Sequence, residues 1–352
     1  MITIFTPSFA DAENTNAQNL TVKEIVARLD PQKYRVLMVR DKTPDERIAR
    51  RPNTVLLPLL RRGNAAYWLT RCLLARPDVY FFPREGPLDS AFLSVRSRFG
   101  LRTALVTYVV TTVDQVVSSP TLERSILEGD VVAGNSIYCS QTITQRFGMP
   151  AATVHDGVST NIFFPNSEAV FRDPAALTVL YAGTFQARKR IPLVIEEAAK
   201  WPNVRFRLAG SGEEEPACRA LVDSLGCRNV EFLGHLSPEK LGDEMRRADV
   251  FLFPSRLEGN PQVLVQAAAC GLPCIAMDYY RSDYVVNDKT GFLVPSDAEL
   301  SQKLELLLTQ CDLRQAMAKA AYEHSRQFDW DRVTKQWEKI FESAIARRRD
   351  RD

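Results

Sequence analysis

The sequence predicts an α/β protein that contains two doubly wound parallel sheets, and three observations lead to this fold class. Short apolar runs alternate with segments of helical periodicity along most of the chain, which is typical of parallel strands covered by helices on both faces. These runs form two series, separated by a stretch with Pro and Asn between Asn161 and Pro174. Glycine-bearing and polar segments follow several runs, and ligands bind at the carboxyl ends of parallel strands.

The elements follow from these runs in order. The strand candidates of the first series are Ile2–Thr6, Arg35–Val39, Thr54–Leu57, Val79–Phe82, Thr103–Val109, Val131–Ala133 and Thr153–His155. Those of the second series are Thr178–Tyr181, Arg205–Leu208, Val230–Leu233, Val250–Phe253 and Cys274–Ala276. Helical periodicity fills gaps such as Leu20–Leu29, Leu193–Lys200 and Val263–Cys270, and it returns in Trp330–Arg349. We therefore expect one domain over residues 1–165, a second over 166–328, and a terminal helix over 329–352.

Bulk composition indicates a globular protein. The chain has 352 residues, 45% hydrophobic and 25% charged, and no apolar run approaches the roughly 20 residues of a membrane-spanning helix. The N-terminus leads directly into an apolar strand, so we expect no secretory signal. Seven cysteines without a CxxC pair indicate reduced thiols and a cytoplasmic protein.

The charge distribution is uneven. The net charge is only +2, but residues 40–102 hold 13 Arg or Lys against 6 Asp or Glu. This excess predicts either an anionic acceptor, or peripheral contact with the inner face of an anionic membrane, or simply a solvated basic face. The segment Asn64–Arg76 is predicted as a helix, either core-facing and amphipathic or lying in a membrane interface. No nucleic-acid partner is expected.

The most informative segment is FPSRLEGNPQVLVQAAACG, residues 253–271. Glu258 and Gly259 follow an apolar strand, and a helix is predicted to open with Asn260 as N-cap and Pro261 in its first turn. A helix start favours an anion, so the backbone N–H groups that follow are expected to face one. These belong to Gln262 and Val263. A carboxylate beside a phosphate site suits a nucleotide-sugar.

This segment resembles the donor-site signature of retaining GT-B glycosyltransferases of family four, P-S-x-x-E-G-x-P-x-V-L. The resemblance implies two Rossmann-like doubly wound domains that face a central cleft. It also implies that Glu258 binds hydroxyls of the donor sugar. The family carries a second acid eight positions later, where it binds the ribose; here that position is Gln266, whose amide can still bond a hydroxyl.

A second segment resembles the part of the family that holds the donor diphosphate, VLYAGTFQARKR at residues 179–190. Gly183 forms its glycine turn, and Arg188, Lys189 and Arg190 supply the positive charge. Three cations at a helix start oppose the helix dipole, and a broken local rule is expected mainly at functional sites. The alternative is an exposed basic turn.

Other fragments resemble the remaining strand ends. Gly210 in FRLAGSGEEE and Gly234 in VEFLGHL are expected to let the backbone approach the nucleotide. The backbone of His235 and Leu236 is expected to face the base. The segment TVHDGVSTNIFFP, residues 153–165, resembles the hinge, and DKTGFLVP, residues 288–295, resembles a later loop.

Acceptor candidates lie in the first domain. Asn14 and Asn16 occupy the loop after the first strand, where a turn with an N-cap is the alternative interpretation. Arg84 and Glu85 stand at a strand end in PREGP, and Tyr108 lies near the position where family members often have His.

The resemblance implies a retaining transferase that moves a sugar from a UDP- or GDP-type donor to a glycan, lipid-linked or small-molecule acceptor. No enzymic nucleophile is evident beside the donor site, which agrees with front-face attack. The D-x-D at Asp329–Asp331 is explained by helix capping, so we predict no metal and no cofactor besides the donor substrate. A sugar-nucleotide epimerase and a non-catalytic sugar-nucleotide-binding subunit are the alternatives.

Overall fold

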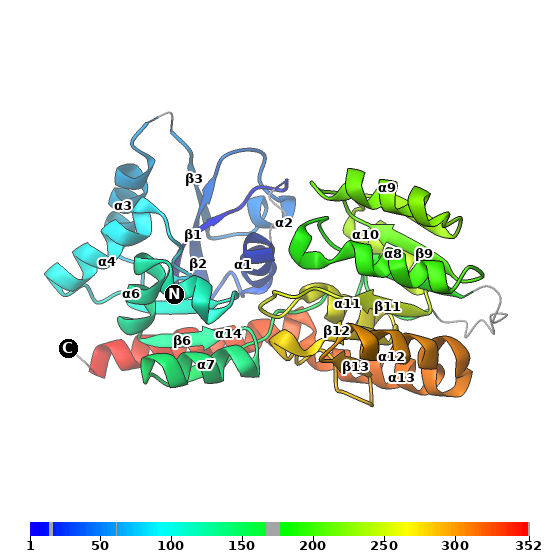
Figure 1. The fold of residues 1–352 in the computed structure, drawn as a ribbon. Coiled ribbons are helices and arrows are strands. Elements are labelled where there is room, and N and C mark those ends of the chain that lie inside the picture. Colours follow the sequence, from blue (N-terminus) through cyan, green and yellow to red (C-terminus); the bar gives the residue numbers. More distant parts are fainter. Residues whose placement is uncertain (14–16, 61, 167–176, 351–352) are drawn as a thin grey trace. The chain divides into compact units, whose positions relative to one another are not determined.

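The computed structural model describes residues 1–13, 17–60, 62–166 and 177–350. The chain forms two compact units: unit 1 contains Met1–Asp156 and Trp330–Asp352, and unit 2 contains Gly157–Asp329. Each unit holds one parallel sheet with helices around it, so the predicted fold class of two doubly wound α/β domains is confirmed (Figure 1).

The sheet of unit 1 has the strand order β3-β2-β1-β4-β5-β6-β7 in the described residues, with all neighbours parallel. Its strands are β1 (Ile2–Phe9), β2 (Tyr34–Arg40), β3 (Thr54–Pro58), β4 (Val79–Phe81), β5 (Ala104–Val109), β6 (Val131–Gly134) and β7 (Ala151–Thr153). The chain order reverses between β1 and β4, and such a switch point is where ligands bind in doubly wound folds.

The last strand of unit 1 corrects one prediction. The strand expected at Thr153–His155 lies instead at Ala151–Thr153, where it pairs with β6. The two alanines at its start have low strand propensity, so the sequence pattern pointed to the β-branched residues just after them.

The helices of unit 1 are α1 (Ala17–Arg28), α2 (Glu46–Ala49), α3 (Asn64–Ala75), α4 (Pro87–Phe99), α5 (Val113–Val117), α6 (Pro120–Leu127), α7 (Ile137–Phe147) and the terminal α14 (Trp330–Asp350). The apolar stripe of α14 packs on this sheet. Trp337 is fully buried, with ring centroids 4.9 Å from Phe81 and 4.7 Å from Tyr108, and Phe341 lies 5.0 Å from Phe81. Burying aromatic surface of this size stabilises unit 1 by about 1.5–3 kcal/mol per side chain.

The sheet of unit 2 has the order β10-β9-β8-β11-β12-β13 and is also parallel throughout. Its strands are β8 (Thr178–Ala182), β9 (Arg205–Ala209), β10 (Val230–Gly234), β11 (Val250–Phe253), β12 (Cys274–Met277) and β13 (Gly291–Val294). Its α-helices are α8 (Ile191–Lys200), α9 (Glu215–Leu225), α10 (Pro238–Arg247), α11 (Gln262–Ala269), α12 (Asp297–Thr309) and α13 (Cys311–Ser325). The switch point of this sheet lies between β8 and β11.

Strand β13 overturns the expectation that residues 288–295 form only a loop. Gly291 pairs with Cys274, and a Cβ atom at Gly291 would lie 2.2 Å from the Cys274 carbonyl oxygen. Only glycine fits this close approach. The apolar part of β13 is three residues long, which is too short for a period-of-two pattern to identify it as an edge strand.

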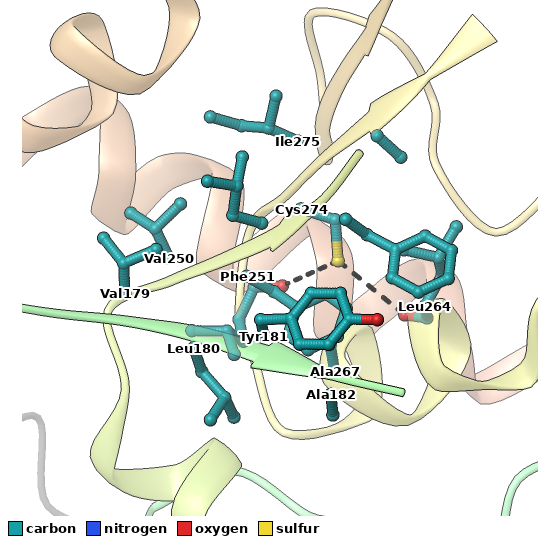
Figure 2. Close-up of a cluster of buried hydrophobic side chains, with 14 of the residues drawn as sticks. Val179, Leu180, Tyr181, Ala182, Val250, Phe251, Leu264, Ala267, Cys274 and Ile275 are labelled. Atoms are coloured by element: carbon teal, nitrogen blue, oxygen red, sulfur yellow. Dashed lines mark hydrogen bonds between the residues drawn. The ribbon is translucent and has the colours of Figure 1, made fainter. Parts of the chain in front are cut away.

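The core of unit 2 joins β8, β11 and β12 to α11 (Figure 2). Tyr181, Phe251 and Ile275 are completely buried here. The Cys274 thiol contacts the carbonyl oxygens of Leu264 and Leu272 at 3.8 and 3.5 Å, and burial raises the pKa of this thiol. All seven cysteines are free thiols. Among the described residues, no helix has the length and apolarity needed to cross a bilayer.

Candidate functional site

The strongest candidate site lies at the switch point of unit 2, where β8 and β11 diverge. After β8 the chain passes Gly183 and forms a short 3₁₀ helix, Ala187–Lys189. After β11 it forms the loop that contains Ser255 and Glu258. The two loops are joined directly, because the Arg256 N–H donates to the Arg188 carbonyl at 2.9 Å. Two segments almost 70 residues apart in sequence therefore form one surface at the carboxyl edge of the sheet.

Glu258 is the centre of this surface. One of its oxygens, Oε1, accepts from Lys189 Nζ at 2.5 Å, from Arg188 at 2.9 Å and from Ser255 Oγ at 2.5 Å. The side chains of Lys189 and Glu258 are only 10% and 11% exposed, whereas that of Arg188 is 41% exposed. Two of the three catalytic candidates, Lys189 and Glu258, thus form a nearly buried ion pair, and the third candidate, Arg188, adds a second cation at its rim.

The surroundings of Lys189 are partly apolar. Its ammonium lies 4.9 Å from the centroid of the Phe253 ring, at a distance suited to a cation–π contact. Burial lowers the pKa of Lys189, and the Glu258 carboxylate opposes that shift. Arg188 also donates to the Leu257 carbonyl at 2.8 Å, which holds it across the loop after β11.

Arg190 stands apart from this ion pair. It is the N-cap of α8 with a left-handed φ of 57°, and its guanidinium pairs with Asp297 at the start of α12. Hydrogen bonding from Arg190 holds the pKa of Asp297 below its usual range. A second guanidinium nitrogen of Arg190 is buried without a hydrogen-bond partner among the described residues. The structure therefore places Arg188 and Lys189 together on Glu258 and directs Arg190 to another helix.

The three predicted strand-end glycines form one row of backbone. The Gly183 N–H donates to Ala209 at 3.0 Å, and the Gly210 N–H donates to the Gly234 carbonyl at 2.8 Å. Gly210 has a φ of 135°, and a Cβ atom there would lie 1.9 Å from the Gly183 carbonyl oxygen. Glycine is required at 210 because two strand-end turns touch there. At the outer end of the row, His235 is exposed and Leu236 is half-buried.

The start of α11 differs from its prediction in one detail. The N-cap position belongs to Pro261, and the helix begins at Gln262 with no side-chain cap. Asn260, predicted as the cap, is buried and accepts from the Ser282 hydroxyl at 2.7 Å. Its amide fixes the loop instead of capping the helix. Gly259 precedes it, Val263 lies in the first turn, and Gln266 is half-buried one turn further along.

Unit 1 has a pocket of about 270 Å³ at the carboxyl ends of β4 and β5. Arg84, Glu85 and Tyr108, three of the five acceptor candidates, line it. Apolar side chains from β5, α5 and α6 form much of its wall, namely Val109, Val116, Leu122 and Ile126. The other two candidates, Asn14 and Asn16, lie outside the described residues.

Arg84 is held in place at this pocket. Its guanidinium donates to the Asn19 side-chain oxygen at 2.6 Å and to Ser8 Oγ at 3.4 Å, while its Nε is buried with no partner in the described part of the chain. Burial lowers the pKa of Arg84. Phe82, two residues before Arg84, has a φ of 60°. This left-handed conformation costs a bulky residue about 1–3 kcal/mol, and such strained residues cluster at functional sites. Tyr108 is buried, with its hydroxyl 2.9 Å from the Val154 carbonyl.

Two residues of the unit 2 site were not singled out from the sequence. Ser255 is completely buried and donates to Glu258, and Phe253 lies under Lys189. The S-x-x-E spacing of Ser255 and Glu258 was a usable signal, because residues three apart in a turn can meet. Within the described residues, no cluster of three or more His, Cys, Asp or Glu side chains is arranged to hold a metal ion.

Comparison with known proteins places this geometry in context. Residues 163–324 match the family model described as glycosyl transferases group 1. A D-inositol 3-phosphate glycosyltransferase of Saccharomonospora viridis is 31% identical over 251 residues, which are 64% of this chain and 58% of that protein. The chain thus spans little more than half the length of this curated relative.

Solved structures resemble the whole chain. Sucrose-phosphate synthase from Thermosynechococcus elongatus has a TM-score of 0.78 at 18% identity, covering 98% of this chain and 100% of that one. HepE from Anabaena in complex with UDP-glucose has a TM-score of 0.78 at 15% identity, covering 97% and 100%. At these identities the likeness concerns the fold, and it confirms the predicted GT-B class.

Proposed function

We propose, from the match of residues 163–324 to the family model of glycosyl transferases group 1, that the chain is a retaining glycosyltransferase that uses a nucleoside-diphosphate sugar. The observation that supports this most directly is the contact of Lys189 and Arg188 with Glu258 at the switch point of unit 2. Cations for a diphosphate and a carboxylate for sugar hydroxyls occur together at the edge where doubly wound folds bind nucleotides.

The ion pair suggests how the donor binds. Without a ligand, Lys189 and Arg188 neutralise Glu258. We propose that the donor diphosphate draws these two cations to its own oxygens, since phosphates accept several charge-assisted hydrogen bonds. Glu258 then accepts hydrogen bonds from hydroxyls of the donor sugar. The start of α11, at Gln262 and Val263, adds a favourable dipole for the phosphates.

The nucleoside lies along the glycine row in this proposal. Close approach at Gly183, Gly210 and Gly234 brings backbone groups toward the nucleotide, and the backbone of His235 and Leu236 faces the base. Gln266 contacts the ribose through its amide. The UDP-glucose bound by HepE, which shares the fold, makes a uridine nucleotide the first donor to test.

The reaction that we propose breaks the bond between the anomeric carbon and the diphosphate oxygen, and forms a bond from that carbon to an acceptor hydroxyl. The hydroxyl proton passes to the departing diphosphate, and attack occurs on the face from which the diphosphate leaves. Lys189 and Arg188 stabilise the negative charge that develops on the leaving group, which is electrostatic catalysis. This proposal requires no metal ion.

We assign the acceptor to the pocket of unit 1. Arg84 presents a guanidinium beside apolar walls, and the proposed acceptor therefore carries an anionic group on a glycan, a lipid-linked glycan or a small molecule. The relative from Saccharomonospora viridis is named for a phosphate-bearing acceptor. Glu85 and Tyr108 complete the proposed contacts. We further propose a cytoplasmic enzyme in peripheral contact with an anionic membrane.

Donor turnover tests the proposal. A panel of UDP- and GDP-sugars is incubated with the enzyme and candidate acceptors, and both nucleoside diphosphate release and sugar-bearing products are measured. Lys189→Met and Glu258→Gln are expected to lower turnover at least tenfold. Lys200→Met is the matched control, because Lys200 lies at the other end of α8 with its side chain 55% exposed. Equal turnover in all four proteins contradicts the proposed site.

Gln266 gives one observation in favour of a second candidate, a non-catalytic sugar-nucleotide-binding subunit, because a neutral amide replaces the family's acid. That candidate predicts nucleotide binding without donor turnover. Conversion of the donor into another nucleotide-sugar, without release of nucleoside diphosphate, indicates an epimerase instead.

A further inference from the structure

A second pocket lies at the opposite edge of the unit 1 sheet from the proposed acceptor pocket. It has a volume of about 540 Å³ and its lining includes Asp78 and Thr103, which directly precede β4 and β5. Its apolar lining comes from the ends of α3 and α4, with Leu73, Val95 and Leu101 among the contributors. The proposed transfer reaction makes no use of this pocket.

Large apolar side chains are exposed around this pocket. Phe99, the last residue of α4, is 68% exposed and also lines the pocket, and Leu74 in the last turn of α3 is 73% exposed. They are among the most exposed large hydrophobic residues in the described chain. Single exposed apolar residues are ordinary, but two of them at the ends of neighbouring helices, beside an open apolar pocket, indicate a contact surface.

Arginines surround the same surface. Arg76 and Arg102 line the pocket and are exposed, and the guanidinium of Arg98 lies 5.9 Å from the centroid of the Phe99 ring. The last turns of α14 add Arg348, which donates to the Leu101 carbonyl at 2.8 and 3.1 Å, and Arg347, which donates to the Asp130 carbonyl. The bonds from Arg348 join the end of α14 to the segment that follows α4, 247 residues earlier in the sequence.

Three carboxylates in the described part of this region already have partners. Asp130 is fully buried and already paired with Arg96 at 2.6 Å, and Asp78 accepts from the Thr3 N–H at 2.7 Å. Glu128 is paired with Arg124. The surface formed by Leu74, Arg76, Arg98, Phe99 and Arg102 is therefore apolar at its centre and cationic at its rim. We call it the α3–α4 surface.

We propose that the α3–α4 surface docks onto an anionic phospholipid membrane, an inference that rests on the peripheral membrane contact of the proposed function and assigns it a site. Arginines near a membrane are attracted to the negative surface potential, and apolar side chains in the interface add the second signal that stable peripheral binding requires. Phe99 and Leu74 insert between lipids, the pocket takes the upper part of an acyl chain, and the arginines contact lipid phosphates. The apolar part of the pocket lining suits an acyl chain, and the basic rim selects an anionic headgroup.

Vesicle co-sedimentation of the full chain tests this inference. Vesicles of phosphatidylcholine alone are compared with vesicles in which a third of the lipid is phosphatidylglycerol, each at low and high salt. The wild-type protein is expected to bind the anionic vesicles at least tenfold more tightly than the neutral ones, and high salt is expected to weaken that binding. Inorganic phosphate at low millimolar concentration is expected not to compete, because it lacks the acyl chain.

Two variants separate the two parts of the surface. Leu74→Ser with Phe99→Ser removes the apolar part, and Arg76→Gln with Arg98→Gln removes part of the charge. Each is expected to reduce binding to anionic vesicles at least tenfold. The matched control is Leu225→Ser with Arg228→Gln, which changes the same residue types at exposed positions of unit 2 and is expected to bind like the wild type.

Three outcomes overturn the inference. They are no binding of the wild-type chain to anionic vesicles at low salt, equal loss of binding in the control, and unchanged binding in both surface variants. If the surface variants instead abolish a dimer detected by light scattering without lipid, the surface is a protein interface and the membrane proposal fails. Melting temperatures show that each variant is folded, and unchanged nucleotide affinity keeps this test independent of the proposed transfer reaction.

Discussion

Removing the charge of Glu258 is expected to destabilise unit 2 because it isolates a buried cation. In Glu258→Gln, Lys189 loses its carboxylate partner while its side chain remains 10% exposed. Breaking a buried ion pair from one side costs about 3–5 kcal/mol. The Arg188 side chain is 41% exposed, so water can solvate its guanidinium when Glu258 is neutral. Losing the Arg188–Glu258 pair therefore adds little to the loss of stability. We therefore expect the free energy of unfolding of Glu258→Gln to fall by about 3 kcal/mol.

The reverse change has a smaller effect. In Lys189→Met, Glu258 keeps Arg188 and Ser255 as partners, and methionine fills a similar volume over the Phe253 ring. We expect a cost of about 1 kcal/mol, the scale of one hydrogen bond. The double variant has neither charge, so its cost should resemble that of Lys189→Met alone, which gives a coupling energy of about 3 kcal/mol in magnitude.

Urea unfolding followed by circular dichroism measures the four proteins of this cycle. The pH dependence gives an independent check. The pKa of Lys189 in the folded protein lies below the ordinary value of 10.5, so the unfolded state binds more protons between the two values and stability rises with pH there. Glu258→Gln removes the carboxylate that opposes this shift, so the pKa of Lys189 lies lower still in that variant, and its deficit should shrink below this window, as pH rises toward the wild-type pKa of Lys189. If the costs of the two single variants add up to the cost of the double variant within about 0.5 kcal/mol, Lys189 and Glu258 are not coupled and the reasoning is refuted.

Three further predictions concern other residues. Gly210→Ala should destabilise unit 2 by more than about 2 kcal/mol in urea denaturation, because its Cβ would lie 1.9 Å from the Gly183 carbonyl oxygen. The control Gly226→Ala has open space around the new Cβ and should cost only about 1 kcal/mol. Asp130→Asn should lower the free energy of unfolding of unit 1 by about 3–5 kcal/mol by leaving Arg96 buried without its carboxylate, and no change in the denaturation midpoint contradicts this. If cationic Lys189 is needed for turnover, the alkaline limb of the pH–rate profile should lie below pH 10.5 and disappear in a Lys189→Arg variant that retains activity.

Much of the fold was predictable because parallel strands buried on both faces leave continuous apolar runs. The runs that became β8 and β11 consist mostly of β-branched or aromatic residues, and their predicted positions agree with the structure to within one residue. Strand β13 was not predicted because its apolar part is short and lies at the sheet edge. Strand β7 was predicted two residues too late because it begins with two alanines. The predicted domain boundaries still await a direct test.

The sequence identified residues of the candidate site, but it did not show which of them contact one another. Lys189 and Glu258 were each selected from local patterns, yet their contact depends on the strand order, which places β8 beside β11. The same holds for Arg190, whose partner Asp297 is more than a hundred positions away. Asn260 had the composition of a helix cap, but its tertiary bond to Ser282 replaced that local role.

The most direct test of the central claim is isothermal titration of the full chain with UDP, GDP and ADP in the presence of excess EDTA. We predict that one of the three binds selectively and that Lys189→Met weakens this binding at least tenfold, while Lys200→Met leaves it unchanged. Failure of all three nucleotides to bind, or equal binding by both variants, would contradict a donor site built on Lys189 and Glu258.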